Sequence, residues 1–209
     1  MLTDNKNRYI KLYQSGQSKL KESDIMVNVA FTGHRPKKLY GYNIYTKDYE
    51  ALRDKCQEVF AYVEDKYGFI YKAYDGMAIG FDTIAFEELY FTRHNVRIIG
   101  CIPFAQQDYK WTKNDKLIYD KMKMSAYELV YIDTIDEYKV KGSIEGEYNV
   151  AKMTRRNEYM VDNSDVLICC WDKVKKGGTW HCIRYALQQD HIEEIININP
   201  NTLEIEILK

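Results

Sequence analysis

The sequence predicts an α/β fold, a Rossmann-like, mostly parallel sheet sandwiched between helices in a single domain. Short apolar runs alternate along the chain with longer stretches whose apolar residues recur at helical spacing. Several of these runs are apolar at nearly every position, which is typical of parallel strands covered by helices on both faces. The chain has 209 residues, enough for one substantial core.

Each predicted element is a segment between turn signals. The strands are expected at 27–32, 69–74, 96–102, 128–133, 166–171, 192–198 and 203–207. The helices are expected at 46–66, 80–94, 112–126, 146–163 and 179–190. Ligands of open parallel sheets bind outside the carboxyl ends of the strands, so the loops that leave the strands are where a site is expected.

Composition indicates how the chain is divided into domains and in which cellular compartment the protein is expected. Residues 1–24 are polar and Lys-rich, and we interpret them as a helical or loosely attached extension ahead of a domain at 25–209. The five cysteines are odd in number and lack metal-type spacing, which indicates reduced thiols in a cytoplasmic protein and no metal site. No stretch resembles a signal peptide or a membrane span, so no membrane partner is expected. We predict no cofactor, and the sequence leaves open whether the protein forms a homo-oligomer.

The charge balance bears on the partner. The formal net charge is −1 and the sequence shows no basic stripe, so we expect nucleic acid to be an unlikely partner. Recognition of an anion must then come from local placement of cationic side chains and backbone N–H groups.

The first strand exit contains Thr32, Gly33, His34 and Arg35. A glycine directly after a buried strand lets the backbone approach a ligand closely. The three other residues supply a hydroxyl, a titratable ring and a guanidinium fork suited to phosphate. The alternative is a plain turn with His34 and Arg35 in solvent, and the spacing alone favours neither interpretation.

The second exit contains Gly76, Met77, Gly80 and Asp82, where a strand passes into a helix. We expect free N–H groups at this helix start to face the cleft and to suit a phosphate. Asp82 is expected to be the N-cap of the helix, and the less favoured alternative is that its carboxylate accepts a ribose hydroxyl.

The third group lies on the predicted helix at 146–163. Met153 and Met160 mark its buried stripe, and Arg156, three residues after Met153, is placed to lean toward the cleft with Asn157 beside it. Paired arginines on a helix are usually exposed charge, so this signal is weak by itself.

The fourth group is Gly177, Gly178 and Thr179 at a helix start, followed by Trp180. Two glycines and a threonine there predict a nest of N–H groups with a hydroxyl. Trp180 is expected either to stack on a base or to pack into the core. Four exits of this chemistry at one edge are a stronger signal than any one of them.

These motifs, in this order, resemble a known family. They read F-T-G-H-R-P at 31–36, D-G-M-A-x-G-x-D at 75–82, R-R-N-x-x-M-V-D-x-S-D at 155–165, and G-G-T at 177–179 followed by Tyr185 and Ala186. The chain resembles the YpsA-like family of the SLOG superfamily, which also holds the lonely-guy phosphoribohydrolases and the DprA/SMF DNA-processing proteins. The resemblance covers roughly 27–189 and implies a Rossmann-like sheet with a pocket for nucleotide-type ligands.

One departure from the lonely-guy pattern concerns catalysis. In those enzymes an arginine precedes M-x-x-x-S-D, and a glutamate follows the threonine of the glycine motif by three residues. The resemblance places Arg156 at the first position and Cys182 at the second. Because cleavage of an N-glycosidic bond needs a carboxylate, a cysteine there argues against that activity.

Two hypotheses of function follow. The first is a sensor or sequestering protein that binds a nucleotide-derived, phosphate-bearing ligand, such as an ADP-ribose-like or cyclic-nucleotide-like signal. The alternative is a hydrolase of an N-glycosidic or phosphate linkage in which Arg156 acts with Glu87 or Asp82. DNA binding in the manner of DprA is disfavoured by the net charge.

Overall fold

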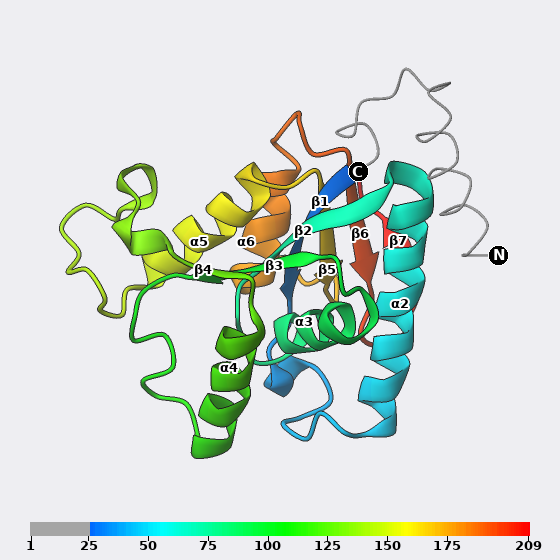
Figure 1. Cartoon of the computed structure of the whole chain (residues 1–209), viewed down its shortest axis with the longest axis horizontal. Coiled ribbons are helices and arrows are strands. Elements are labelled where there is room, and N and C mark those ends of the chain that lie inside the picture. The colour runs from blue at the N-terminus through cyan, green and yellow to red at the C-terminus, as the bar shows by residue number, and fades with distance from the viewer. Residues whose placement is uncertain (1–25) are drawn as a thin grey trace.

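The computed structural model describes residues 26–209, and the predicted extension at 1–24 lies outside the described residues. The strands are Met26–Gly33 (β1), Phe69–Asp75 (β2), Arg97–Ile102 (β3), Glu128–Tyr131 (β4), Val166–Cys170 (β5), Glu194–Ile198 (β6) and Ile205–Ile207 (β7). They form one sheet in the order β4-β3-β2-β1-β5-β6-β7 (Figure 1). All neighbours pair in parallel except β6 and β7, which are antiparallel.

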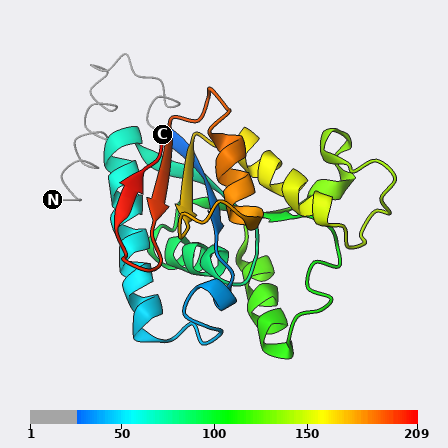
Figure 2. The same ribbon diagram turned by 180° about the vertical axis from the view of Figure 1, so that it is seen from behind.

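Helices cover both faces of this sheet. Lys47–Tyr67 (α2), Phe81–Thr92 (α3) and Lys113–Ser125 (α4) lie on one face, and Val150–Asp162 (α5) and Gly177–Ala186 (α6) lie on the other, as the two opposite views show (Figures 1 and 2). Short 3-10 helices also occur at Pro36–Lys38 (η2), Ile132–Thr134 (η3) and Asp136–Tyr138 (η4). The predicted fold class, a single α/β domain with a mostly parallel sheet between helices, is confirmed.

Each face of the sheet has its own apolar core. Phe31 meets the rings of Phe60 and Phe81 edge to face on the α2–α3 side. On the other side, Cys182 and Ile183 of α6 pack against β5. All five residues of β5 are buried because both of its faces are covered, which explains why its sequence is apolar without alternation.

Two predicted helices have different bounds in the structure. The helix expected at 146–163 begins at Val150, because the side chain of Asn149 accepts a hydrogen bond from the Ala151 N–H (2.8 Å) and caps the helix there. The helix expected at 179–190 runs from Gly177 to Ala186, so the glycine pair forms its first turn.

The segment before α5 is held to the domain by a buried lysine. Nζ of Lys152 is 2.8 Å from Oδ2 of Asp133 and donates to the carbonyls of Ile144 (2.6 Å) and Glu147 (3.0 Å). Both charged side chains are almost fully buried. This buried ion pair closes the loop between η4 and α5 over the carboxyl side of β4.

The order of strands in the sheet indicates where a ligand site is expected. From β1 the chain moves outward through β2, β3 and β4, and then returns to the other side of β1 with β5. In such sheets the reversal leaves a crevice at the carboxyl ends of the two strands, here β1 and β5. Since α3 and α6 follow parallel strands directly, both begin at this edge (Figure 2). No helix within residues 26–209 has the length and apolar character needed to cross a membrane.

Candidate functional site

The turn after β1 is tied to the end of β5. The N–H of His34 donates to the carbonyl of Cys170 (3.1 Å), and its Nε2 lies 2.9 Å from Oδ1 of Asp172. The imidazole is 4% exposed, and burial lowers the pKa of His34 although Asp172 opposes the shift. The ring predicted to face a ligand therefore joins two strand exits instead.

Arg35 behaves differently from its neighbour. Its side chain is exposed, and its guanidinium lies over the ring of Trp111 at 5.6 Å from the centroid. Trp111 in turn meets Tyr119 edge to face. An arginine stacked on an indole offers a flat cationic surface at the rim of the crevice.

The turn between β2 and α3 is satisfied by its own side chains. Oδ1 of Asp75 accepts from the N–H of Met77 (2.7 Å), and Oδ2 of Asp82 accepts from the N–H of Ala78 (3.4 Å). The N–H of Phe81 donates to the carbonyl of His34 (3.1 Å). Of the N–H groups expected to be free at this exit, those of Met77, Ala78 and Phe81 therefore already have acceptors within the protein.

The expected cap of α3 is also different. The N-cap is Gly80, with φ of 115°, and Asp82 lies inside the first turn of the helix. A side chain at Gly80 would be strained at this φ and would collide with the backbone carbonyl of His34. The prediction that Asp82 is the N-cap was wrong, because the close approach of the two loops requires a glycine at that position.

Arg156 brings the second and third predicted groups together. Its Nη1 donates to the carbonyl of Gly76, and its Nε donates to Oδ1 of Asn157 (2.9 Å). A Cβ added at Gly76 would meet this guanidinium and lie 2.7 Å from Oδ2 of Asp82. The glycine therefore makes room for the arginine and the carboxylate at the same place.

Two buried carboxyl groups adjoin this arginine. Burial raises the pKa of Asp75 well above its ordinary value, and the nearby charge of Asp82 raises it further. Burial also raises the pKa of Asp82, while the positive charges of Arg156 and Arg35 oppose that shift. Burial therefore favours the protonated form of Asp75, whereas Arg156 favours the charged form of Asp82.

The start of α6 is open. Lys176 occupies the N-cap position without a side-chain cap, and a Cβ at Gly177 or Gly178 would meet nothing within 4 Å. Nδ2 of Asn157 donates to the carbonyl of Gly178 (3.4 Å). Asn157 therefore connects Arg156 to the glycine turn, and the first N–H groups of α6 are left to face solvent or a ligand.

Thr32 of β1 lies near Cys182 of α6, and Trp180 belongs to the first turn of the same helix. Burial raises the pKa of the Cys182 thiol to about 12, and the nearby Thr32 hydroxyl opposes that shift. Trp180 stacks on Trp171 with ring centroids 5.2 Å apart and planes at 16°. Of the two roles expected for Trp180, packing is the one that this contact favours. A thiol at Cys182 stays protonated at neutral pH and supplies no charge.

The predicted positions do not all meet. Thr179 is buried at the start of α6, and Met77 is fully buried beneath the second turn. Glu87 lies five residues after Asp82, about 140° around the helix. Its carboxylate pairs with Arg53 of α2 at 2.6 Å. The structure therefore brings Asp82, and not Glu87, to Arg156.

Sequence reasoning missed three residues of this site. They are Asp75, Gln107 and Asp172. Gln107 and Asp172 are positioned by contacts with residues far away in the chain, whereas Asp75 accepts from Met77, two residues on. Nε2 of Gln107 donates to the carbonyl of Met77 (2.9 Å). Oε1 of Gln107 and Oδ2 of Asp75 are buried without a hydrogen-bond partner among the described residues. Only Asp75 carried a signal, since it ends a strand directly before Gly76.

Comparison with known proteins identifies the family. The model of the YpsA family, described as the YspA SLOG family, matches residues 29–203. The chain belongs to this SLOG family. The resemblance that the four motifs predicted is confirmed, and SLOG membership suggests a nucleotide-related function. A curated relative, the uncharacterized SPbeta prophage-derived protein YoqJ of Bacillus subtilis (strain 168), is 32% identical over 163 residues, which cover 75% of this chain and 92% of YoqJ.

A solved structure with a similar fold is that of DNA processing protein A from Helicobacter pylori. It has a TM-score of 0.48 and 17% identity, and the match covers 82% of this chain but 64% of that one. That protein is described by its single-stranded DNA binding mode. The expectation that nucleic acid is an unlikely partner is contradicted by this match, and it is withdrawn. The net charge of a whole chain does not report where its cations lie.

Proposed function

We propose that this SLOG protein binds a nucleotide-derived, phosphate-bearing ligand at the carboxyl edge of its sheet, beside β1 and β5. The observation that carries the proposal is the uncapped start of α6. Gly177 and Gly178 leave open space there, and Asn157 connects the turn to the buried guanidinium of Arg156. Unpaired N–H groups at a helix start suit an anion, because the helix dipole adds to their hydrogen bonds.

The other rim of the crevice suits a base. Arg35 lies over Trp111, and Tyr109 near it is exposed. Flat aromatic and guanidinium surfaces stack on the face of any nucleobase, whatever hydrogen-bonding groups the edge of that base carries. A phosphate at α6 and a base near Arg35 are both compatible with an ADP-ribose-like or cyclic-nucleotide-like signal. Binding of such a signal by a sensor or sequestering protein needs no catalytic group.

A second candidate, hydrolysis of the ligand, rests on the pairing of Asp82 with Arg156. Arg156 favours the charged form of Asp82, and burial favours the protonated form of Asp75 next to it. A protonated acid beside a charged carboxylate is the pair of groups that general acid–base catalysis requires. Cys182 cannot take either part, because its thiol is buried and uncharged.

Titration calorimetry against nucleoside monophosphates, cyclic nucleotides and ADP-ribose tests the binding proposal. Arg35→Ala should weaken the binding of a ligand about tenfold, as the loss of one charge-assisted contact implies. Lys121→Ala, which removes an exposed charge on α4, is the matched control and should bind like the wild type. Absence of binding across the whole set would reject the proposal. Chromatography of the same mixtures tests hydrolysis, which Asp82→Asn should abolish.

A further inference from the structure

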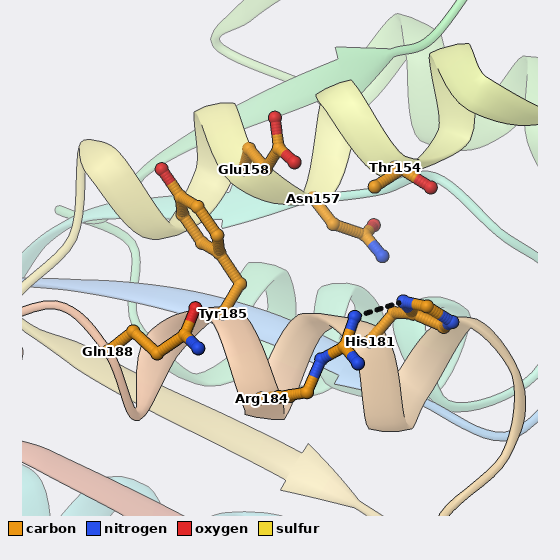
Figure 3. A pocket seen from close by; sticks show the side chains of 7 residues that line it. All are labelled: Thr154, Asn157, Glu158, His181, Arg184, Tyr185 and Gln188. Carbon is orange, nitrogen blue, oxygen red and sulfur yellow. Dashed lines mark hydrogen bonds between the residues drawn. The ribbon is translucent and has the colours of Figure 1, made fainter.

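A small polar cavity lies between α5 and α6, along α6 from His181 onward. Its volume is about 70 Å³. Its lining residues are Thr154, Asn157 and Glu158 of α5, His181, Arg184 and Tyr185 of α6, and Gln188 just after α6 (Figure 3). Both helices begin at the carboxyl edge of the sheet, so the cavity adjoins the proposed phosphate site, and Asn157 belongs to both.

The side chains that could fill this cavity are held away from it. The Tyr185 hydroxyl donates to Oδ1 of Asp162 (2.8 Å), and Glu158 pairs with Arg155 at 2.6 Å. Asn157 is fixed between Arg156 and Gly178. A cavity kept open by such contacts needs little rearrangement to receive a ligand group.

The cavity contains an uncompensated cation. Within residues 26–209, the polar contact made by the Arg184 guanidinium is the one from Nη2 to Nδ1 of His181, at 3.2 Å. Glu158, the carboxylate that lines the same cavity, is already paired with Arg155. A guanidinium with free N–H groups has the fork geometry that suits a phosphoryl group. In Figure 3 Thr154 and Asn157 point from α5 toward the helix that carries Arg184 and His181.

We propose that this cavity is the subsite for a second phosphoryl group, so that the ligand class is one with two linked phosphoryl groups, as in a nucleoside diphosphate. This inference rests on the proposed function, because the first phosphoryl group would occupy the start of α6. His181 follows Gly178 by about 4.5 Å along the helix axis, and the guanidinium of Arg184 extends back to His181, with Nη2 at 3.2 Å from Nδ1. Adjacent phosphoryl groups can therefore reach both the helix start and this guanidinium. Arg184 and the Thr154 hydroxyl then bind the second group.

Calorimetry on the full chain tests this assignment with matched pairs of probes. The pairs are nucleoside monophosphates against the corresponding diphosphates, and inorganic phosphate against pyrophosphate. We expect the wild type to bind the diphosphate member at least about tenfold more tightly, the ratio that a charge-assisted contact implies. In Arg184→Gln this preference should disappear while affinity for monophosphates stays unchanged. Arg184→Lys should recover part of it.

Control variants separate a local effect from a general one. Arg184 is exposed, so Arg184→Gln should leave the melting temperature unchanged, and Lys121→Ala on the opposite face should keep the diphosphate preference. Equal affinity of the wild type for both members of each pair would overturn the subsite and leave the proposed function standing. A preference that survives in Arg184→Gln would also overturn it. Failure of every phosphate-bearing probe would reject both proposals.

Discussion

The guanidinium of Arg156 donates a hydrogen bond to the backbone carbonyl of Gly76, 80 positions away in the chain. This contact joins α5 to the end of β2, where the second predicted strand exit begins. It also places a positive charge beside the buried carboxyl group of Asp82. The shape of the crevice and its charge balance therefore depend on one side chain.

Gly76→Ala is expected to destabilise the protein by about 1–3 kcal/mol, since the added methyl group would overlap the Arg156 guanidinium and crowd Asp82. Urea denaturation measures the loss. Gly178→Ala is the matched control, because a Cβ there meets nothing within 4 Å and alanine favours a helix. Equal destabilisation of the two variants would contradict the role assigned to Gly76.

Arg156→Met should cost about 3 kcal/mol of unfolding free energy, because it leaves a buried carboxylate without its balancing charge. Adding Asp82→Asn to this variant should restore a large part of the loss, since the uncompensated charge is then removed. A double-mutant cycle by chemical denaturation measures the coupling. Additive effects of the two substitutions would show that the residues do not interact.

Asp75→Asn should change how stability depends on pH. The pKa of Asp75 is raised in the folded protein above its ordinary value of 3.8, so the native state holds this proton more tightly than the unfolded chain does. The wild type therefore loses stability as the pH rises from about 4 through the raised pKa, whereas asparagine cannot ionise. Its amide oxygen can still accept from the Met77 N–H.

The difference in unfolding free energy between Asp75→Asn and the wild type should accordingly move in favour of the variant as the pH rises. Denaturation at a series of pH values measures this difference. The same comparison in the Asp82→Asn background removes the titration of the other buried acid, whose charge acts on Asp75. A difference that stays constant with pH would show that folding does not raise the pKa of Asp75.

Lys152→Met should release the loop between η4 and α5, because three acceptors lose their donor and Asp133 becomes a buried, unpaired carboxylate. A loss of about 3–5 kcal/mol is expected for breaking a buried ion pair. Limited trypsin digestion should then cleave faster at Lys139 and Lys141. Lys121→Met, an exposed substitution on α4, should leave both stability and cleavage unchanged.

Local patterns predicted much of this structure. The apolar run at 166–171 became β5 because a strand covered on both faces needs apolar residues at every position. The glycine pair before Thr179 predicted a helix start, which the structure places at Gly177. The Asp82 cap failed because the backbone of His34 approaches Gly80 closely, and no local pattern reports an approach between two loops.

The sequence by itself determined the alternation of strands and helices, the family, and the kinds of side chain at each strand exit. These properties depend on periodicity and on short motifs, which are local. Only the tertiary structure decided the partners, namely His34 with Asp172, Arg156 with Gly76, and Glu87 with Arg53 instead of with the site. Such pairings follow from the order of strands in the sheet and from which helix faces pack together. Neither the strand order nor the packing of helix faces can be deduced from the residues next to a given position in the sequence.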